Sequence, residues 1–217
     1  MTIELTDTQA RIIGCLMEKS VTTPDQYPLS VNALTNACNQ KSSRDPVMNL
    51  SSGEVQHEVQ ALQDKHLVVC EENFKSQTQK YTHRLCNTPF SDYQFDTAQF
   101  ATICVLLLRG PRTPGEIRAN SGRLHTFADN EAVLETLQSL QSYAGGALTT
   151  ELARTPGRKD AEYRECLSEH SGDSGESFVP VEQPARESNL SAQTLADRVT
   201  LLEREVAELK QLLANYK

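Results

Sequence analysis

The pattern of hydrophobic and polar positions along the chain occurs twice, with the second copy about ninety residues after the first. The apolar positions of the first helix match between the copies: Ile13 with Ile103, Leu16 with Leu106, and Met17 with Leu107. Each copy continues into a second capped helix, a third amphipathic helix and a pair of short alternating strands. A set of helices and strands that recurs in the same order predicts two small structural units of one type.

The first copy carries a start signal before each helix. Thr6 followed by Gln9 is a capping-box pattern and predicts a helix to about residue 19. Ser30 predicts the start of a second helix, and Ser51 or Ser52 the start of a third. The buried stripe of the third helix is Val55, Val59 and Leu62. Residues 67–70 and 80–85 predict a hairpin whose second strand turns Tyr81, His83 and Leu85 to one face.

The second copy repeats these signals. Asp96 precedes Gln99 by three residues, Thr113 precedes a proline, and Asp129 or Asn130 opens the third helix. Residues 148–152 and 162–167 predict the hairpin. Three helices followed by a hairpin is the order of a winged helix, a helix-turn-helix variant. We therefore expect a mainly helical α+β fold with winged-helix domains at 1–88 and 89–168.

The rest of the chain has a different composition. Residues 169–190 are rich in Ser, Gly, Glu and Pro, which predicts a flexible acidic linker. Residues 191–217 predict a C-terminal helix with a heptad pattern, and their spacing favours a parallel homodimer, although the helix could instead fold back on the same chain. The expected dimer seam is Leu195, Val199, Leu202, Val206, Leu209 and Leu213.

The charge of the chain limits how it can bind nucleic acid. The net charge is −8, divided as −2 over residues 1–88, −2 over 89–168 and −4 over 169–217. A field of this sign repels phosphate at long range, so DNA binding requires local basic patches. The N-terminus has no apolar signal-peptide region, and the longest apolar run is too short to span a bilayer. We expect a soluble cytoplasmic protein with no membrane contact.

Three stretches carry a family resemblance: YPLSVNALTNACNQKSSRDPVMNLS at 27–51, LLLRGPRTPGEIR at 106–118 and RTPGRKDAEYRECL at 154–167. The chain resembles the YceH-like family of bacterial proteins. The resemblance implies two winged-helix domains in one compact unit and implies no established biochemical activity.

The candidate binding residues lie in the loop at 39–50, on the third helix of the first copy and on both wings. The loop is long for a helix-turn-helix connection and ends at a helix N-terminus, a natural anion site. Arg44 is either an anion contact or a loop-fixing ion pair with Asp45. The candidates for DNA or partner binding are Lys41, Ser43, Arg44, Asn49, Gln56, Gln60, Lys75, Lys80, Arg84, Arg154, Arg158 and Lys159. The basic residues on the wings could also be ordinary solvated charges.

Two functions remain open at this level. One is a dimeric DNA-binding regulator that uses the first copy, since Gln side chains can pair with adenine. The other is a protein-interaction module, since Glu131 and Glu135 face outward on the third helix of the second copy. The histidines are scattered and no phosphate-binding glycine loop occurs, so we expect no enzyme activity, catalytic residues, metal or cofactor. His83 is expected to be a core histidine.

Overall fold

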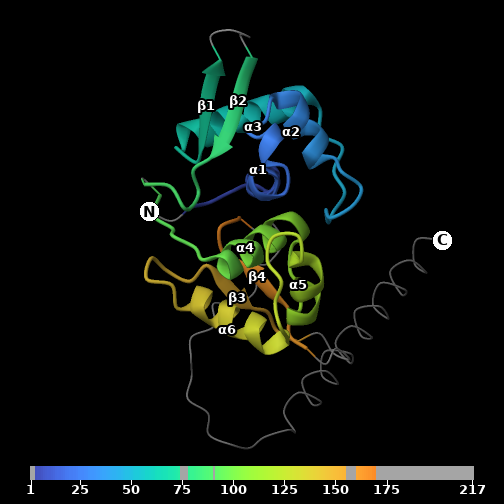
Figure 1. Cartoon of the computed structure of the whole chain (residues 1–217), viewed down its shortest axis with the longest axis vertical. Helices are drawn as coiled ribbons and strands as arrows, with labels where there is room; N and C mark the ends of the chain where they lie inside the picture. Colours follow the sequence, from blue (N-terminus) through green and yellow to red (C-terminus); the bar gives the residue numbers. More distant parts are fainter. Residues whose placement is uncertain (1–2, 74–77, 90, 155–159, 170–217) are drawn as a thin grey trace, which may run out of the picture. The chain divides into compact units, whose positions relative to one another are not determined.

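In the computed structural model, the described residues are 3–73, 78–89, 91–154 and 160–169, and they form an α+β fold (Figure 1). The elements of the first repeat are α1 (Asp7–Thr22), the 3-10 helix η1 (Pro24–Gln26), α2 (Val31–Cys38), α3 (Ser52–Asp64), β1 (Val68–Asn73) and β2 (Thr78–His83). The elements of the second repeat are α4 (Thr97–Arg109), α5 (Pro114–Ser121), α6 (Asn130–Gln141), β3 (Thr149–Glu151) and β4 (Tyr163–Glu165). The repeated order predicted from the sequence is therefore present.

The predicted helix starts are confirmed by side-chain hydrogen bonds. Thr6, Ser51, Asp96 and Thr113 each close a capping box with the residue three positions on, and Ser30 and Asp129 each accept one backbone N–H. Each cap satisfies donors that the first helical turn leaves without a partner. The helix starts are therefore determined by residues within three positions of each cap.

Each repeat has one antiparallel hairpin. In the first, Val68 lies opposite His83 and Cys70 opposite Tyr81. In the second, Thr149 lies opposite Glu165 and the paired strands are only three residues long. The strands differ from their predicted ranges: β1 and β2 extend further toward the hairpin tip, and β3 and β4 are shorter. The limits of each strand depend on which residues pair across the hairpin. The alternation of residues within one strand does not reveal that pairing.

A further backbone pairing occurs at the same place in both repeats. Leu29, directly before the cap of α2, exchanges two backbone hydrogen bonds with Tyr81. Arg112, directly before the cap of α5, exchanges two with Tyr163. The segment that leads into the second helix is therefore attached to the second strand of each hairpin. This pairing fixes the hairpin against the helices.

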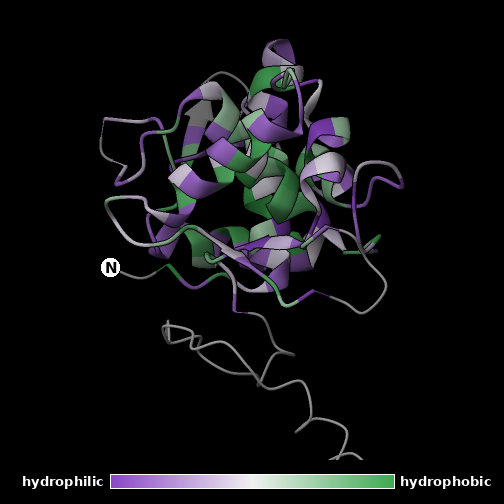
Figure 2. Ribbon diagram, turned by 90° about the horizontal axis from the view of Figure 1, so that it is seen from below, coloured by the Kyte–Doolittle hydropathy of each residue, from purple (hydrophilic) through white to green (hydrophobic). Residues whose placement is uncertain are grey.

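The two repeats share part of their hydrophobic interior. Helices α1 and α4 pack against each other, and both belong to one compact unit. The main apolar cluster contains Ile13 and Leu16 of α1 together with Ile103 and Leu107 of α4. A smaller cluster inside the second repeat includes Ile117. Figure 2 shows hydrophobic ribbon gathered in the interior, with hydrophilic segments around it.

Gly14 permits the close approach of these two helices. A Cβ atom at this position would lie 2.9 Å from Leu108 Cδ2 and 3.2 Å from Leu107 Cβ, so a larger residue would require these side chains, or α4 with them, to shift. The Cys104 thiol also donates to the Gly14 carbonyl at 3.5 Å.

None of the helices in the described ranges is long and apolar enough to cross a membrane. The predicted linker and the heptad seam from Leu195 to Leu213 lie outside the described residues, apart from Glu169. The domain boundary at residue 88 and the homodimer stay predictions.

Candidate functional site

The outward face of α3 carries amide and imidazole side chains. Val55, Val59 and Leu62 are fully buried, so the intervening positions face outward. Gln56 and Gln60 are both exposed there, as the sequence analysis predicted, and His57 is exposed beside them. These side chains offer hydrogen-bond donors and acceptors at helical spacing.

Two carboxylates of α3, Glu54 and Glu58, could repel phosphate, and both accept hydrogen bonds within the protein. Glu54 accepts hydrogen bonds from the backbone N–H and hydroxyl of Ser51, each at 2.7 Å. These bonds lower the pKa of the Glu54 carboxyl. Glu58 accepts a 2.8 Å bond from Gln9 Nε2, and Gln9 Oε1 in turn accepts a 3.0 Å bond from Lys65 Nζ. Both carboxylates have defined partners, although Glu54 remains exposed.

A chain of hydrogen bonds joins this face to the hairpin. Gln56 Nε2 donates to the Tyr81 hydroxyl at 3.3 Å, and that hydroxyl donates to Gln79 Oε1 at 3.1 Å. Lys80 and Arg84 are half-buried on β2 and just after it. The face of α3 and the side of the hairpin that carries Gln79 therefore form one polar surface, which we name the α3–hairpin surface: Gln56, His57, Gln60 and Gln79. Lys80 lies on the other face of β2, because successive strand residues point to opposite sides.

The prediction that Arg44 is a surface anion contact is wrong. Arg44 is 5 % exposed, and its Nη1 and Nη2 atoms donate to the two Glu18 carboxylate oxygens at 3.3 and 2.7 Å. Its Nε donates to the Ala37 carbonyl at 3.0 Å. The partner of Asp45 is Arg112, so the alternative of an Arg44–Asp45 pair is also wrong. Arg44 instead fixes the loop to α1 and α2.

A second buried arginine, which the sequence analysis missed, holds the same loop. Arg11 is 2 % exposed and donates to the Pro46 carbonyl at 2.7 Å and to the Cys38 carbonyl at 3.3 Å. Arg11 and Glu18 are seven residues apart and thus share one face of α1. That spacing, on a face that is otherwise apolar, was the available signal for a buried polar cluster.

The remaining loop candidates lie at the surface. Lys41 and Asn49 are exposed, and Ser43 is half-buried with a backbone φ of 61°. Asn39 closes the loop, because its side chain exchanges two 2.8 Å hydrogen bonds with the backbone of Leu50. The loop is thus a fixed structure that presents Lys41 and Asn49 outward.

The corresponding surface of the second repeat is acidic. Val133, Leu137 and Leu140 are fully buried, and Glu131 and Glu135 are exposed on α6. Arg154 is exposed after β3. The other predicted hairpin cations, Lys75 in the first repeat and Arg158 and Lys159 in the second, lie outside the described residues.

The second helix of the first repeat adds amides that the sequence analysis did not include. Helix α2 packs against α3 and leaves Asn32 and Asn36 exposed. Their spacing of four residues places them on one face of the helix, opposite Leu34.

Comparison with known proteins identifies the family. The model of the family described as "Protein of unknown function, DUF480" matches residues 5–158. A UPF0502 protein of Shewanella woodyi is 50% identical over 212 residues, which cover 94% of this chain and 95% of the relative. A UPF0502 protein of Shewanella oneidensis is 47% identical over 215 residues, covering 97% and 96%. One from Enterobacter sp. (strain 638) is 46% identical over 213 residues, covering 98% and 96%.

The chain therefore belongs to the DUF480 family of bacterial proteins, also named UPF0502. The family resemblance found in the sequence is confirmed.

Proposed function

We propose that the chain is a tandem winged-helix protein that binds double-stranded DNA as a homodimer through its first repeat. The order of three helices and a hairpin in each repeat supports the winged-helix assignment. The equivalent backbone pairings of Leu29 with Tyr81 and of Arg112 with Tyr163 add further support. In a winged helix these pairings would attach the segment before the second helix to the hairpin that forms the wing.

The observation that carries the DNA proposal is the α3–hairpin surface. Glutamine side chains can make paired hydrogen bonds to adenine in the major groove, and α3 presents Gln56 and Gln60 one turn apart. Lys80 on the wing and Lys41 in the loop would meet phosphates. The Glu54 and Glu58 carboxylates keep their charge, but Ser51 holds Glu54 at the N-terminus of α3 and Gln9 holds Glu58 against α1.

The second repeat would serve a different role in this proposal. The carboxylates of Glu131 and Glu135 on α6 would repel phosphate, so α6 does not enter a groove. The packing of α1 against α4 makes the second repeat a fixed support for the first.

The alternative function is a protein-interaction module without DNA contact. The acidic exposed face of α6 favours it, because a basic surface of a partner protein would complement Glu131 and Glu135. Under this alternative the first repeat would show no affinity for duplex DNA at low salt.

The test is binding of random-sequence duplex DNA by the full-length protein, followed by fluorescence anisotropy between about 50 and 200 mM salt. We expect log affinity to fall with log salt with a slope of about −2 to −3, as two or three neutralised phosphates would give. Lys41→Ala should weaken binding and reduce the slope by about 1. Absence of binding at the lowest salt would exclude the DNA proposal and leave the protein-interaction alternative.

A further inference from the structure

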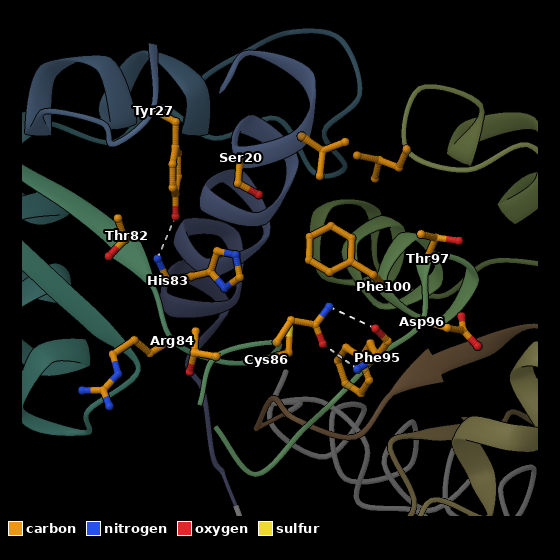
Figure 3. Close-up of a pocket in the computed structure, with 14 residues that line it drawn as sticks. Ser20, Tyr27, Thr82, His83, Arg84, Cys86, Phe95, Asp96, Thr97 and Phe100 are labelled. Carbon is orange, nitrogen blue, oxygen red and sulfur yellow. Dashed lines mark hydrogen bonds between the residues drawn. The ribbon is translucent and has the colours of Figure 1, made fainter. Parts of the chain in front are cut away.

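A cavity of about 460 Å³ lies where the end of α1, strand β2 and the start of α4 meet (Figure 3). This volume is within the range of sites that bind small organic molecules. Its apolar wall consists of Val21, Tyr27, Phe95, Phe100 and Leu124. All of the residues that line it belong to the described part of the chain. The cavity could not be predicted from the sequence, because its walls come from segments far apart in the chain.

The polar groups in the wall are mostly engaged within the protein. The Asn87 side chain exchanges hydrogen bonds of 3.0 and 2.6 Å with the backbone of Phe95. The Asp96 carboxylate caps α4, and the Tyr27 hydroxyl accepts the His83 backbone N–H at 3.0 Å. The hydroxyl of Ser20 donates to the Met17 carbonyl at 2.7 Å. These groups shape the cavity, and their hydrogen bonds within the protein limit what they can offer a ligand.

The ring of His83 is the exception. It points from β2 toward Phe100, with the ring centroids 6.2 Å apart and a tilt of 48° (Figure 3). Its Nδ1 atom is sealed from solvent and has no hydrogen-bond partner among the described residues. The other ring nitrogen, Nε2, lies on the side of the ring nearer Phe100 (Figure 3). Burial lowers the pKa of His83 to about 4, so the ring is neutral near pH 7. A neutral imidazole has one donor and one acceptor nitrogen. The expectation that His83 is an ordinary core histidine therefore needs amendment, since the ring forms part of a cavity wall.

The charges around the cavity select against ions. The guanidinium of Arg84 points away from the cavity, although the residue contributes to its wall (Figure 3). The Asp96 carboxylate lies at the wall and repels anions. The neutral His83 ring supplies no positive charge for a carboxylate or phosphate, and the apolar wall does not compensate the lost hydration of a cation.

We propose that this cavity binds a neutral, planar aromatic molecule of one or two rings that packs against Phe100 and forms one hydrogen bond with the His83 ring. The aromatic and aliphatic wall removes the ligand's apolar surface from water. The hydrogen bond would use Nε2 of the ring, because Nδ1 is sealed from the cavity. The proposal concerns a ligand site and does not depend on DNA binding.

The experiment uses 1-naphthol as the neutral probe and 1-naphthoate as its charged counterpart, each added to the full-length protein. The chain contains no Trp, so the fluorescence of the probe can be read without tryptophan emission. We expect saturable binding of 1-naphthol, at least tenfold tighter than that of 1-naphthoate. Amide resonances of Thr82 and Thr97, both in the cavity wall, should shift with the same midpoint in heteronuclear NMR.

Two variants test the site independently. His83→Phe keeps an aromatic ring and removes both nitrogens, so 1-naphthol affinity should fall at least fivefold. His57→Phe, the same change at an exposed position on α3, should leave it unchanged. Ser20→Leu keeps His83 and fills part of the cavity, and it should abolish binding even if His83→Phe does not fold. Equal affinity for the two probes, or equal affinity in wild type and Ser20→Leu, would overturn the proposal.

Discussion

Arg44 shows the limit of sequence reasoning at the scale of one residue. The sequence places this arginine in a long loop next to Asp45, which makes an exposed cation the natural expectation. Its actual partner, Glu18, lies 26 residues earlier in the chain, on the inner face of α1. Only the packing of the loop against α1 and α2 brings the two together. The exposed candidates, Gln56 and Gln60, were predictable because helical periodicity alone decides which way they face.

Arg44→Ala should destabilise the fold. Any loss of DNA binding in this variant should follow from its lower stability. Removing one member of a buried ion pair costs about 3–5 kcal/mol, because the other charge is left uncompensated. Lys19 Nζ lies 3.4 Å from Glu18 and would remain, so we expect about 3 kcal/mol. Urea unfolding measures the change. Lys41→Ala, an exposed cation in the same loop, is the control and should change stability by less than about 0.5 kcal/mol.

The same pair predicts a pH dependence. Burial opposes ionisation of Glu18, but the hydrogen bond and charge of Arg44 outweigh it and hold the Glu18 pKa below its usual value of 4.5. A carboxyl with a lowered pKa in the folded state contributes stability that is complete above that usual value and is lost as pH falls through the folded value. The wild type should therefore lose more stability below pH 4.5 than Arg44→Ala. Parallel curves for the two proteins would contradict the ion-pair account.

At the scale of helices and strands, an element was predicted more accurately when the residues that determine it lie close together in the sequence. Helix starts were predictable because a cap and its partner are three residues apart, as with Thr6 and Gln9. Strand limits were less accurate, since pairing partners such as Val68 and His83 come from separate segments. The pairing of Leu29 with Tyr81 was not foreseen at all, because a single bridged residue leaves no periodic pattern.

Gly14→Val tests the contact between α1 and α4. A Cβ atom at residue 14 would lie 2.9 Å from Leu108 Cδ2 and 3.2 Å from Leu107 Cβ, and a branched side chain would intrude further. Overpacking of this kind costs about 1–3 kcal/mol, and thermal unfolding followed by circular dichroism would report it as a lower Tm. Gly53→Val is the matched control on α3, where the nearest atom would be 3.9 Å away. An equal effect of the two changes would mean that α1 and α4 do not pack closely.

At the scale of the whole molecule, two repeats with the same element order differ in surface chemistry. Gln60 and Gln138 occupy the same position in α3 and α6, five residues after Val55 and Val133 respectively. Around them, α3 exposes Gln56 and one carboxylate, Glu54, whereas α6 exposes Glu131 and Glu135. The repeat was predictable from the sequence. The shared interior was not, because an apolar face on α1 or α4 does not indicate which helix covers it.

Deleting residues 190–217 should convert a dimer into a monomer. The heptad spacing of this segment supports the expectation, and the segment itself lies outside the described residues. Light scattering on the full chain and on the truncated chain would measure both masses. If the truncated protein still contains two chains per particle, the coiled-coil dimer is contradicted. That result would not bear on the DNA proposal.

The most direct test of the central claim compares Gln60→Glu with Gln138→Glu in the duplex-binding assay. Both changes add one carboxylate at equivalent exposed positions, so they alter the net charge equally. If the first repeat binds DNA through α3, Gln60→Glu should weaken binding at least tenfold, because a carboxylate then faces the nucleic acid. Gln138→Glu should change it by less than twofold. Equal effects of the two variants, or a larger effect of Gln138→Glu, would contradict the assignment of DNA binding to the α3–hairpin surface.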